Sequence, residues 1–216
     1  MDNMLGLLYL ASPTLPIGSF AYSQGLEKAI DEGRVHDKDS LEYWCLDVMH
    51  LGLAQLDLVF IGQVFHAIAL KNVETISRCN EEILASRETA ELYQEEVNLG
   101  QSMRRLMTTQ GLMLEDIDIP SKPSFLCCYT MAGVSLGLDL ISIKTAFLWS
   151  WLENQTAVAC KSVPLGQSDA QRIILAARSK MASLVKDEFT EAFGSMPGQV
   201  MASALHETQY SRLFRS

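Results

Sequence analysis

Apolar and polar positions recur along most of the chain with the spacing of α-helices. From Ile76 to Met103, apolar and small residues return at three- and four-residue steps, while charged residues such as Glu81 and Glu95 fill the other faces. This pattern is too long for one uncapped helix, so we expect a break near Ser86. The strict alternation of a half-buried strand is nearly absent. The pattern therefore predicts an all-α protein.

The most apolar window of the chain, residues 51–70, is expected to follow a capped helix start. Asp39 followed by Glu42 has the spacing of an acidic capping box, which predicts a helix leading into this window. The window is about as long as a membrane span, but polar residues including Asp57 and His66 interrupt it. We therefore expect a single buried core helix and no membrane span.

A second capping signature lies in the segment PLGQSDAQ. Pro164 and Gly166 are expected to shape a turn, and Ser168 with Gln171 to close the cap of a long helix. Further helices are expected over 125–136 and from Ile143 onward. No linker or repeat divides the chain, so the prediction is one all-α bundle of roughly eight to ten helices.

The segment SPTLPIGSFAYSQGLEKAI, residues 12–30, concentrates proline, glycine and serine near the start of the chain. It lacks the lysine of a phosphate-binding loop, and its glycines and serines have neither the dinucleotide-binding nor the nucleophile-elbow spacing. Pro16, Gly18, Phe20 and Gly25 are instead expected to form a structural motif, a rigid turn that feeds a short helix.

Composition and charge indicate which classes of partner and which cellular compartment the protein suits. The chain has 216 residues with 26 acidic and 17 basic side chains, and its net charge of −9 disfavours nucleic acid and anionic membranes. The odd count of five cysteines, without a C-x-x-C pair, indicates reduced buried thiols in a cytosol. Asp2 takes the place of the basic region that a secretory signal requires.

Metal ligands and catalytic carboxylates are not clustered in the sequence. The four histidines are scattered, so a structural role is expected for each, although pairing across a subunit interface stays open. Neighbouring acids such as Glu95 and Glu96 diverge by about a hundred degrees on a helix, and we expect them on solvated faces. No metal site, cofactor or catalytic residue is predicted.

The last residues differ from the rest of the acidic chain. We expect a helical domain over residues 1–208 and a separate tail over 209–216. Tyr210, Leu213 and Phe214 are large apolar groups among Arg212 and Arg215, and aromatic and arginine side chains often dominate interfaces. From the residues alone, docking on a partner and packing on the protein's own core are both open.

Three blocks of this sequence resemble a known family. SPTLPIGSFAYSQGLEKAIDEGRV, VPLGQSDAQR and the terminal HETQYSRLFRS are similar, in order and spacing, to urease accessory protein F. The intervening ETAELYQEEVNLGQSMRRLM also resembles the central helix of that family, so the similarity spans nearly the whole chain.

The resemblance implies an all-helical, dimeric cytoplasmic protein without catalytic activity. In that family the protein binds accessory protein D, also called H, and the pair recruits the GTPase accessory protein G. The assembly delivers nickel to the urease apoprotein. A non-catalytic assembly factor for nickel insertion is therefore the leading hypothesis.

The resemblance also suggests two contact regions. Tyr210, Arg212, Leu213, Phe214 and Arg215 match the terminal block and become candidates for contact with protein D/H, with Phe214 as the apolar anchor. In the first block Ser23, Gln24 and Glu27, if exposed, either form a polar face for the GTPase or only build their helix. Direct contact through PLGQSDAQ is the alternative to its capping role.

Two other functions stay open at this point. One is a metallochaperone that itself ligates nickel at a dimer interface or along an internal tunnel. The other is a GTPase-activating factor, which typically needs an exposed arginine finger, and Arg34, Arg104 and Arg172 are equal candidates for it.

Overall fold

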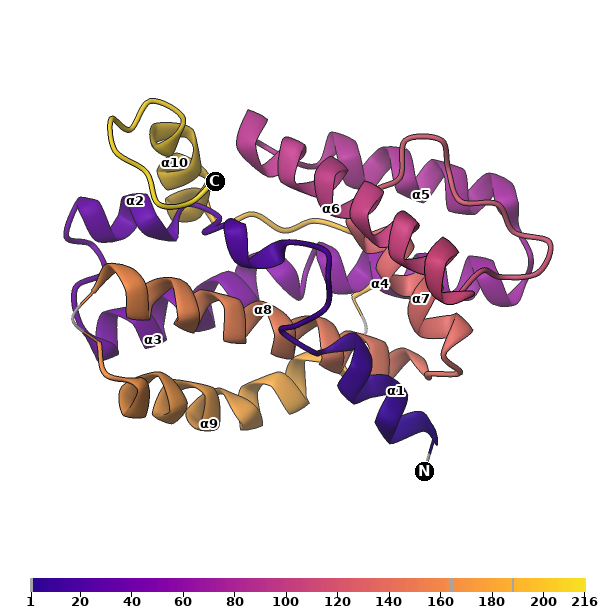
Figure 1. Cartoon of the computed structure of the whole chain (residues 1–216), viewed down its shortest axis with the longest axis horizontal. Coiled ribbons are helices and arrows are strands. Elements are labelled where there is room, and N and C mark those ends of the chain that lie inside the picture. The colour runs from indigo at the N-terminus through magenta and orange to yellow at the C-terminus, as the bar shows by residue number, and fades with distance from the viewer. Residues whose placement is uncertain (1, 164, 188) are drawn as a thin grey trace.

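The protein is a bundle of helices, as a computed structural model shows for residues 2–163, 165–187 and 189–216 (Figure 1). These residues contain ten α-helices, one 3₁₀ turn and one π-helical segment, and no strand, which confirms the all-α prediction. The helices are α1 (Asp2–Leu10), α2 (Leu26–Asp31), α3 (Lys38–Asp47), α4 (Asp57–Ala69), α5 (Val73–Ala85), α6 (Ala90–Gln110), α7 (Phe125–Ser135), α8 (Leu140–Ser162), α9 (Gln167–Leu184) and α10 (Pro197–His206).

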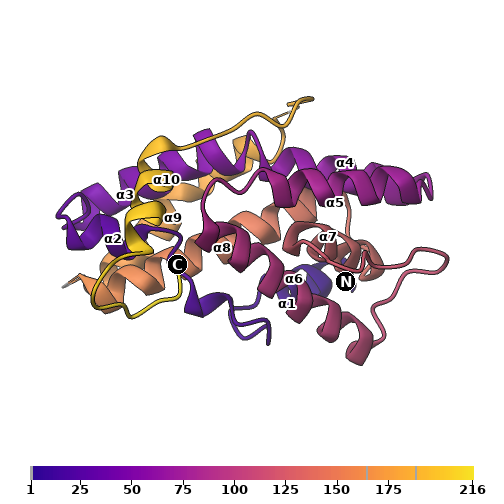
Figure 2. The same cartoon turned by 90° about the horizontal axis from the view of Figure 1, so that it is seen from above.

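The long helix α8 organises one part of the bundle. It packs against α1, α2, α3, α4 and α9, while α4, α5, α6 and α7 pack on one another beside it. Helix α10 lies against α2 and α6, and both views place it with the C-terminal residues on the side of the molecule away from α1 (Figures 1 and 2). This arrangement brings the C-terminal residues next to the start of α2.

The helical pattern is interrupted between α5 and α6, at the position predicted from the sequence. Helix α5 ends at Ala85, Ser86 is its C-cap, and Thr89 caps α6 by accepting the N–H of Leu92 at 3.2 Å. The predicted helix over 125–136 matches α7. Four of the five cysteines are buried and all five are free thiols, as the composition indicated.

Helix α3 begins two residues before the predicted start. Asp37, not Asp39, is the N-cap, and it forms a reciprocal capping box with Ser40. Asp39 lies in the first turn, where a carboxylate interacts favourably with the helix dipole without capping the helix. The prediction of an Asp39–Glu42 box was wrong because α3 already begins at Lys38, so that Asp37 is the N-cap and Asp39 lies inside the first turn.

The apolar window 51–70 is not one helix. Helix α3 continues into a π-helical segment, Val48–Leu53, and α4 starts only at Asp57. No single helix of the described chain is long and apolar enough to cross a membrane, whereas Lys38–Leu53 and Asp57–Ala69 pass together by length and composition with a bend of 42°. Most apolar side chains of this pair belong to the core of the bundle.

Helix α9 does not start with the predicted cap. Its N-cap is Gly166, which offers no side-chain hydrogen bond, and Ser168 and Gln171 lie inside the helix as exposed residues. The capping role given to Ser168 and Gln171 was wrong because the helix begins one residue before Ser168. Pro164 lies outside the described residues.

The N-terminal turn forms largely as predicted. Gly18 and Gly25 both adopt left-handed backbone conformations with φ of 83°, which glycine accepts without strain. At Gly25 a side chain would also be excluded by space, since a Cβ atom would lie 2.8 Å from the backbone nitrogen of Ser203 in α10. Pro16 and Phe20 are exposed, so their part in the turn is limited to the backbone.

Candidate functional site: a docked C-terminal segment

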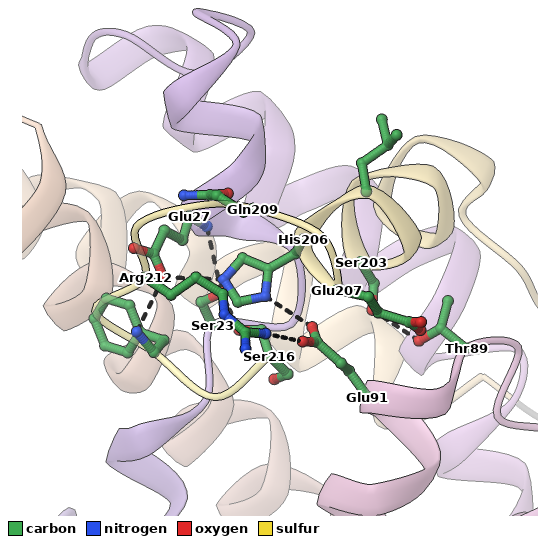
Figure 3. A network of polar contacts seen from close by, with 12 residues as sticks. Ser23, Glu27, Thr89, Glu91, Ser203, His206, Glu207, Gln209, Arg212 and Ser216 are labelled. Atoms are coloured by element: carbon green, nitrogen blue, oxygen red, sulfur yellow. Dashed lines mark hydrogen bonds and ion pairs between the residues drawn. The ribbon is translucent and has the colours of Figure 1, made fainter.

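The residues after α10 fold back over the N-terminal part of the chain. We call residues 207–216 the C-terminal segment. It crosses the start of α2 and ends beside Ser23, with Phe214 only 7% exposed and Ser216 fully buried (Figure 3). Lys161 Nζ lies 5.5 Å from the centre of the Phe214 ring. In this structure the segment is therefore packed on its own chain.

Glu27, in the first turn of α2, holds the backbone of this segment. Its Oε1 accepts the N–H of Leu213 at 2.7 Å and its Oε2 accepts the N–H of Phe214 at 3.0 Å. Glu27 is itself 6% exposed. Hydrogen bonds to an ionised carboxylate are stronger than neutral ones, so this side chain is the principal polar clamp on the segment.

His206, at the end of α10, joins the clamp to α6. Its ring is fully buried, with Nε2 at 3.1 Å from Glu27 Oε2 and Nδ1 at 2.8 Å from Glu91 Oε2 (Figure 3). Since an ionised carboxylate only accepts hydrogen bonds, both contacts require protons on both ring nitrogens when both carboxylates are ionised. His206 thus bridges two carboxyl groups contributed by different helices, α2 and α6.

The same end of α10 and the segment are fastened to the start of α6. Arg212 donates to Glu91 Oε1 at 2.7 Å, and Glu207 accepts the N–H of Ala90, one of the free donors of the first turn of α6, at 3.1 Å. Thr89 and Ser203 hydroxyls lie 2.8 Å apart in a buried contact. These bonds fix the angle at which the segment leaves α10.

The end of the segment lies in a small polar pocket. The backbone oxygen of Ser216 accepts the N–H of Ser23 at 2.8 Å and also its hydroxyl, and the Ser216 hydroxyl donates to Glu95 Oε2 at 3.0 Å. Gln24 links the pocket to the bundle, since it donates to Glu95 at 2.7 Å and accepts from Trp151 Nε1 at 2.7 Å.

Burial raises the pKa of Glu95 to about 7, although hydrogen bonds from Gln24 and Ser216 oppose the shift. The carboxyl group that holds the last residue of the segment is therefore close to half-ionised at neutral pH. Its chain neighbour Glu96 is equally buried, and burial raises its pKa despite the nearby guanidinium of Arg87. The prediction that Glu95 and Glu96 occupy solvated faces was wrong, because α6 is enclosed on both of these sides.

A cavity of about 190 Å³ lies behind the segment, between the N-terminal turn, α6, α7 and α8. Gln24 and Glu95 line it, so it adjoins the docked segment. Across it Arg87 donates to Asp57 Oδ1 and to Glu96 Oε2, both at 2.8 Å, and Glu96 also accepts the N–H of Leu126 at 2.9 Å. This buried ion triad ties α4, α6 and the start of α7 together.

Not all of the segment faces inward. Tyr210 is fully exposed and Leu213 is 70% exposed, and on α10 Met201 and Leu205 are exposed as well. Arg215 is also exposed, while its N–H donates to the carbonyl of Ala21 at 2.8 Å. The docked segment therefore presents an apolar outer face, and its backbone is fixed from below.

The two predicted contact regions, residues 23–27 and residues 210–215, lie against each other in this structure. Ser23 and Glu27 are buried beneath the segment and Gln24 is half-buried, so Ser23 and Glu27 do not meet the condition of exposure on which the polar-face alternative depends. The predicted tail residues Arg212 and Phe214 lie against this region.

Sequence reasoning missed the residues that link these two regions. His206 begins the terminal block HETQYSRLFRS, but in the sequence it is only one of four scattered histidines with no marked partner. Glu91 and Glu95 lie four residues apart on one face of α6, and this spacing was the available signal.

The histidines do not assemble into a metal centre within one chain. In residues 2–163, 165–187 and 189–216, three or more histidine, cysteine or acidic side chains are nowhere grouped in a way that could hold a metal ion. His36 and His66 are exposed, whereas the buried Nδ1 of His50 has no hydrogen-bond partner. The arginines considered as fingers differ in exposure: Arg34 and Arg172 are exposed and Arg104 is half-buried.

The fold and the site together define an all-helical protein whose main polar network fastens its own C-terminal segment to α2 and α6. Comparison with known proteins specifies the class. The UreF family model matches residues 35–178. Proteins named urease accessory protein UreF from Chromohalobacter salexigens, Hahella chejuensis and Teredinibacter turnerae are 40%, 41% and 38% identical to the chain. These alignments cover 99%, 99% and 100% of this chain and 94%, 98% and 99% of the relatives.

The chain belongs to the UreF family. It is a urease accessory protein, involved in the maturation of urease and without catalytic activity of its own. The resemblance of the three sequence blocks is thereby confirmed at the level of the family.

Proposed function

We propose that this protein is a cytoplasmic, homodimeric scaffold that binds accessory protein D/H through the outer face of its docked C-terminal segment. On that scaffold the GTPase accessory protein G is recruited and nickel is delivered to the urease apoprotein. The observation that carries the proposal is the segment itself, which is fixed by Glu27 from below and presents Tyr210 and Leu213 outward.

The predicted contact residues of the segment fall into an outward-facing group and a group that contacts the protein's own chain. Tyr210 and Leu213 are free to contact protein D/H directly, and Met201 and Leu205 of α10 are further exposed apolar side chains. Apolar and aromatic groups of this kind are typical anchors of a protein interface. Phe214 and Arg212 are engaged with their own chain, so their contribution to binding is to hold the segment in shape.

Recruitment of the GTPase depends, in this proposal, on the same segment. Ser23 and Glu27 lie under it and cannot contact a second protein while it is docked. Their effect on the GTPase is therefore indirect, through the position of the segment and of protein D/H bound to it. Nickel ligation and GTPase activation by this chain are alternatives that no observation on the described residues favours.

A co-purification experiment tests the proposal. The double variant Tyr210→Ala, Leu213→Ala removes the outward apolar groups without removing any hydrogen bond of the clamp. We expect loss of co-purification with protein D/H and an unchanged helical circular dichroism spectrum. Leu70→Ala, at the exposed end of α4, is the matched control and should bind normally. Normal binding by the double variant would refute the proposed docking face.

Oligomeric state and recruitment are measured separately. Light scattering on the purified chain should give twice the mass of one chain if it forms the proposed dimer. Protein G should be retained on the chain only in the presence of protein D/H, and retention should fail in the double variant.

A further inference from the structure

We propose that the docked C-terminal segment completes a binding pocket for an oxyanion, a carboxylate or a phosphate, between Arg105 of α6 and Arg215 of the segment. The pocket is a surface hollow of about 340 Å³ formed by the N-terminal turn, α6 and the segment. Both guanidinium groups belong to exposed residues and line the same hollow. It is a different hollow from the cavity behind the segment, and Ile17 borders both.

The charge around this pocket is opposite to that of the protein. The chain carries 26 acidic and 17 basic residues, yet no acidic side chain is among those that line the pocket. In the described chain neither Arg105 nor Arg215 has an ion-pair partner, whereas Arg87 and Arg212 are both paired with carboxylates. Two unpaired arginines at one hollow suit a ligand with several oxygen acceptors, because a guanidinium offers donors in a planar fork.

Two hydroxyl groups that line the pocket, those of Tyr22 and Ser102, also have protons available for hydrogen bonding. Asn98 Nδ2 donates to the Tyr22 hydroxyl at 3.2 Å, and Arg105 donates to Ser102 Oγ at 3.0 Å. Each hydroxyl oxygen is thus used as an acceptor, and neither hydroxyl proton has an acceptor in the described part of the chain. Tyr22 is 4% exposed, so its hydroxyl is held at the wall of the pocket by the core. Such a group of donors is complementary to an anion.

Half of the charge in this pocket depends on the docked segment. Arg215 is positioned by its N–H bond to Ala21, and the residues on either side of it are held by Glu27 and Ser23. An anion that binds both arginines must therefore stabilise the docked segment, and docking must strengthen anion binding by the same factor.

Side-chain NMR of the full-length protein tests the pocket directly. Sodium phosphate and sodium acetate are titrated into protein with ¹⁵N-labelled arginine, against sodium chloride at equal ionic strength. We expect saturable shifts of the Nε–Hε signals of Arg105 and Arg215 with the oxyanions only. Shifts that chloride reproduces would overturn the proposal, since they would report only general screening.

Variants locate the binding. Arg105→Gln and Arg215→Gln should each weaken phosphate binding about tenfold or more, since each removes charge-assisted hydrogen bonds. Arg178→Gln, which removes an exposed arginine of α9, is the control and should leave it unchanged. Glu27→Ala frees the segment without touching the pocket and should also weaken binding. Unchanged affinity in both Arg105→Gln and Arg215→Gln would refute the assignment.

A second arm distinguishes a free ion from a partner's side chain. If protein D/H inserts a carboxylate here, its addition displaces phosphate from the two arginines; if the ligand is a free ion, phosphate stays bound in the complex. Both outcomes support the pocket. The titration of the isolated chain does not depend on the proposed scaffold function, so the two can fail separately.

Discussion

Replacing Glu27 by alanine should release the C-terminal segment while the helical bundle stays folded. The carboxylate accepts the N–H groups of Leu213 and Phe214 and contacts His206 Nε2 at 3.1 Å. When Glu27 is removed, the buried N–H of Phe214 and the buried imidazole lose their acceptor together.

The size of the effect follows from these contacts. A hydrogen bond to a charged group contributes about 1.5–3 kcal/mol, so the Phe214 and His206 contacts together give about 3–6 kcal/mol. The N–H of Leu213 adds little, because Leu213 is exposed and water can replace its acceptor. A loss of about 3 kcal/mol increases the open population of the segment about 150-fold.

Hydrogen exchange at single amides measures this opening. The N–H of Arg215, bonded to Ala21, and the N–H of Ser23, bonded to Ser216, should lose protection in Glu27→Ala. The N–H of Ile143, inside the bundle, should keep its protection. Glu81→Ala, which removes an exposed acid of α5, is the matched control and should leave all three amides unchanged. If the N–H groups of Arg215 and Ser23 keep their wild-type protection in Glu27→Ala, then Glu27 does not hold the segment in place.

Three further predictions concern stability, measured by chemical denaturation. Because burial raises the pKa of Glu95 to about 7 from 4.5, the native state keeps a proton that the unfolded state has lost, so this residue lowers the free energy of unfolding as pH rises from about 5 to 7. Relative to the wild type, Glu95→Gln should therefore gain about 2 kcal/mol over that range, and parallel pH profiles of the two proteins would contradict this. Arg87→Ala should destabilise the protein by about 3–5 kcal/mol, since it leaves the carboxylates of Asp57 and Glu96 buried without their cation. Arg78→Ala, which breaks an exposed pair with Glu82, should lower stability far less, because water screens that pair. Equal effects of the two substitutions would argue against the triad. Gly25→Ala should lower stability by about 1–2 kcal/mol from the positive φ alone, and by more because the new Cβ atom clashes with Ser203. Gly33 has a similar φ but open space around it, so Gly33→Ala should show only the loss that comes from φ. Equal losses in the two variants would exclude the clash.

The helices could be predicted from the sequence because their signals are local. The break at Ser86 and helix α7 follow from periodicity, proline and chain-neighbour capping, which depend on residues within a few positions. Errors arose where two local signals competed. Asp37 with Ser40 and Asp39 with Glu42 have the same three-residue spacing of a capping box, so spacing alone does not choose between the two helix starts.

The site could be predicted only in part, because its contacts join distant segments. Glu95 has the sequence neighbourhood of an exposed helical acid, and its burial comes from Gln24 and Ser216, which lie far away in the chain. Glu27 looks like an ordinary first-turn acid until residues 213 and 214 supply its donors. Family resemblance marked both segments as important, and it gave no indication that they touch each other.

The contact between Ser23 and Ser216 also has a consequence for protein synthesis. The two residues are 193 positions apart in the sequence, and at about 5–20 residues per second a ribosome needs about 10–40 s to make the chain between them. During that time residues 22–27 have left the ribosome without their partner segment. A nascent chain therefore cannot form the contact between Ser23 and Ser216 until synthesis reaches the end of the C-terminal segment.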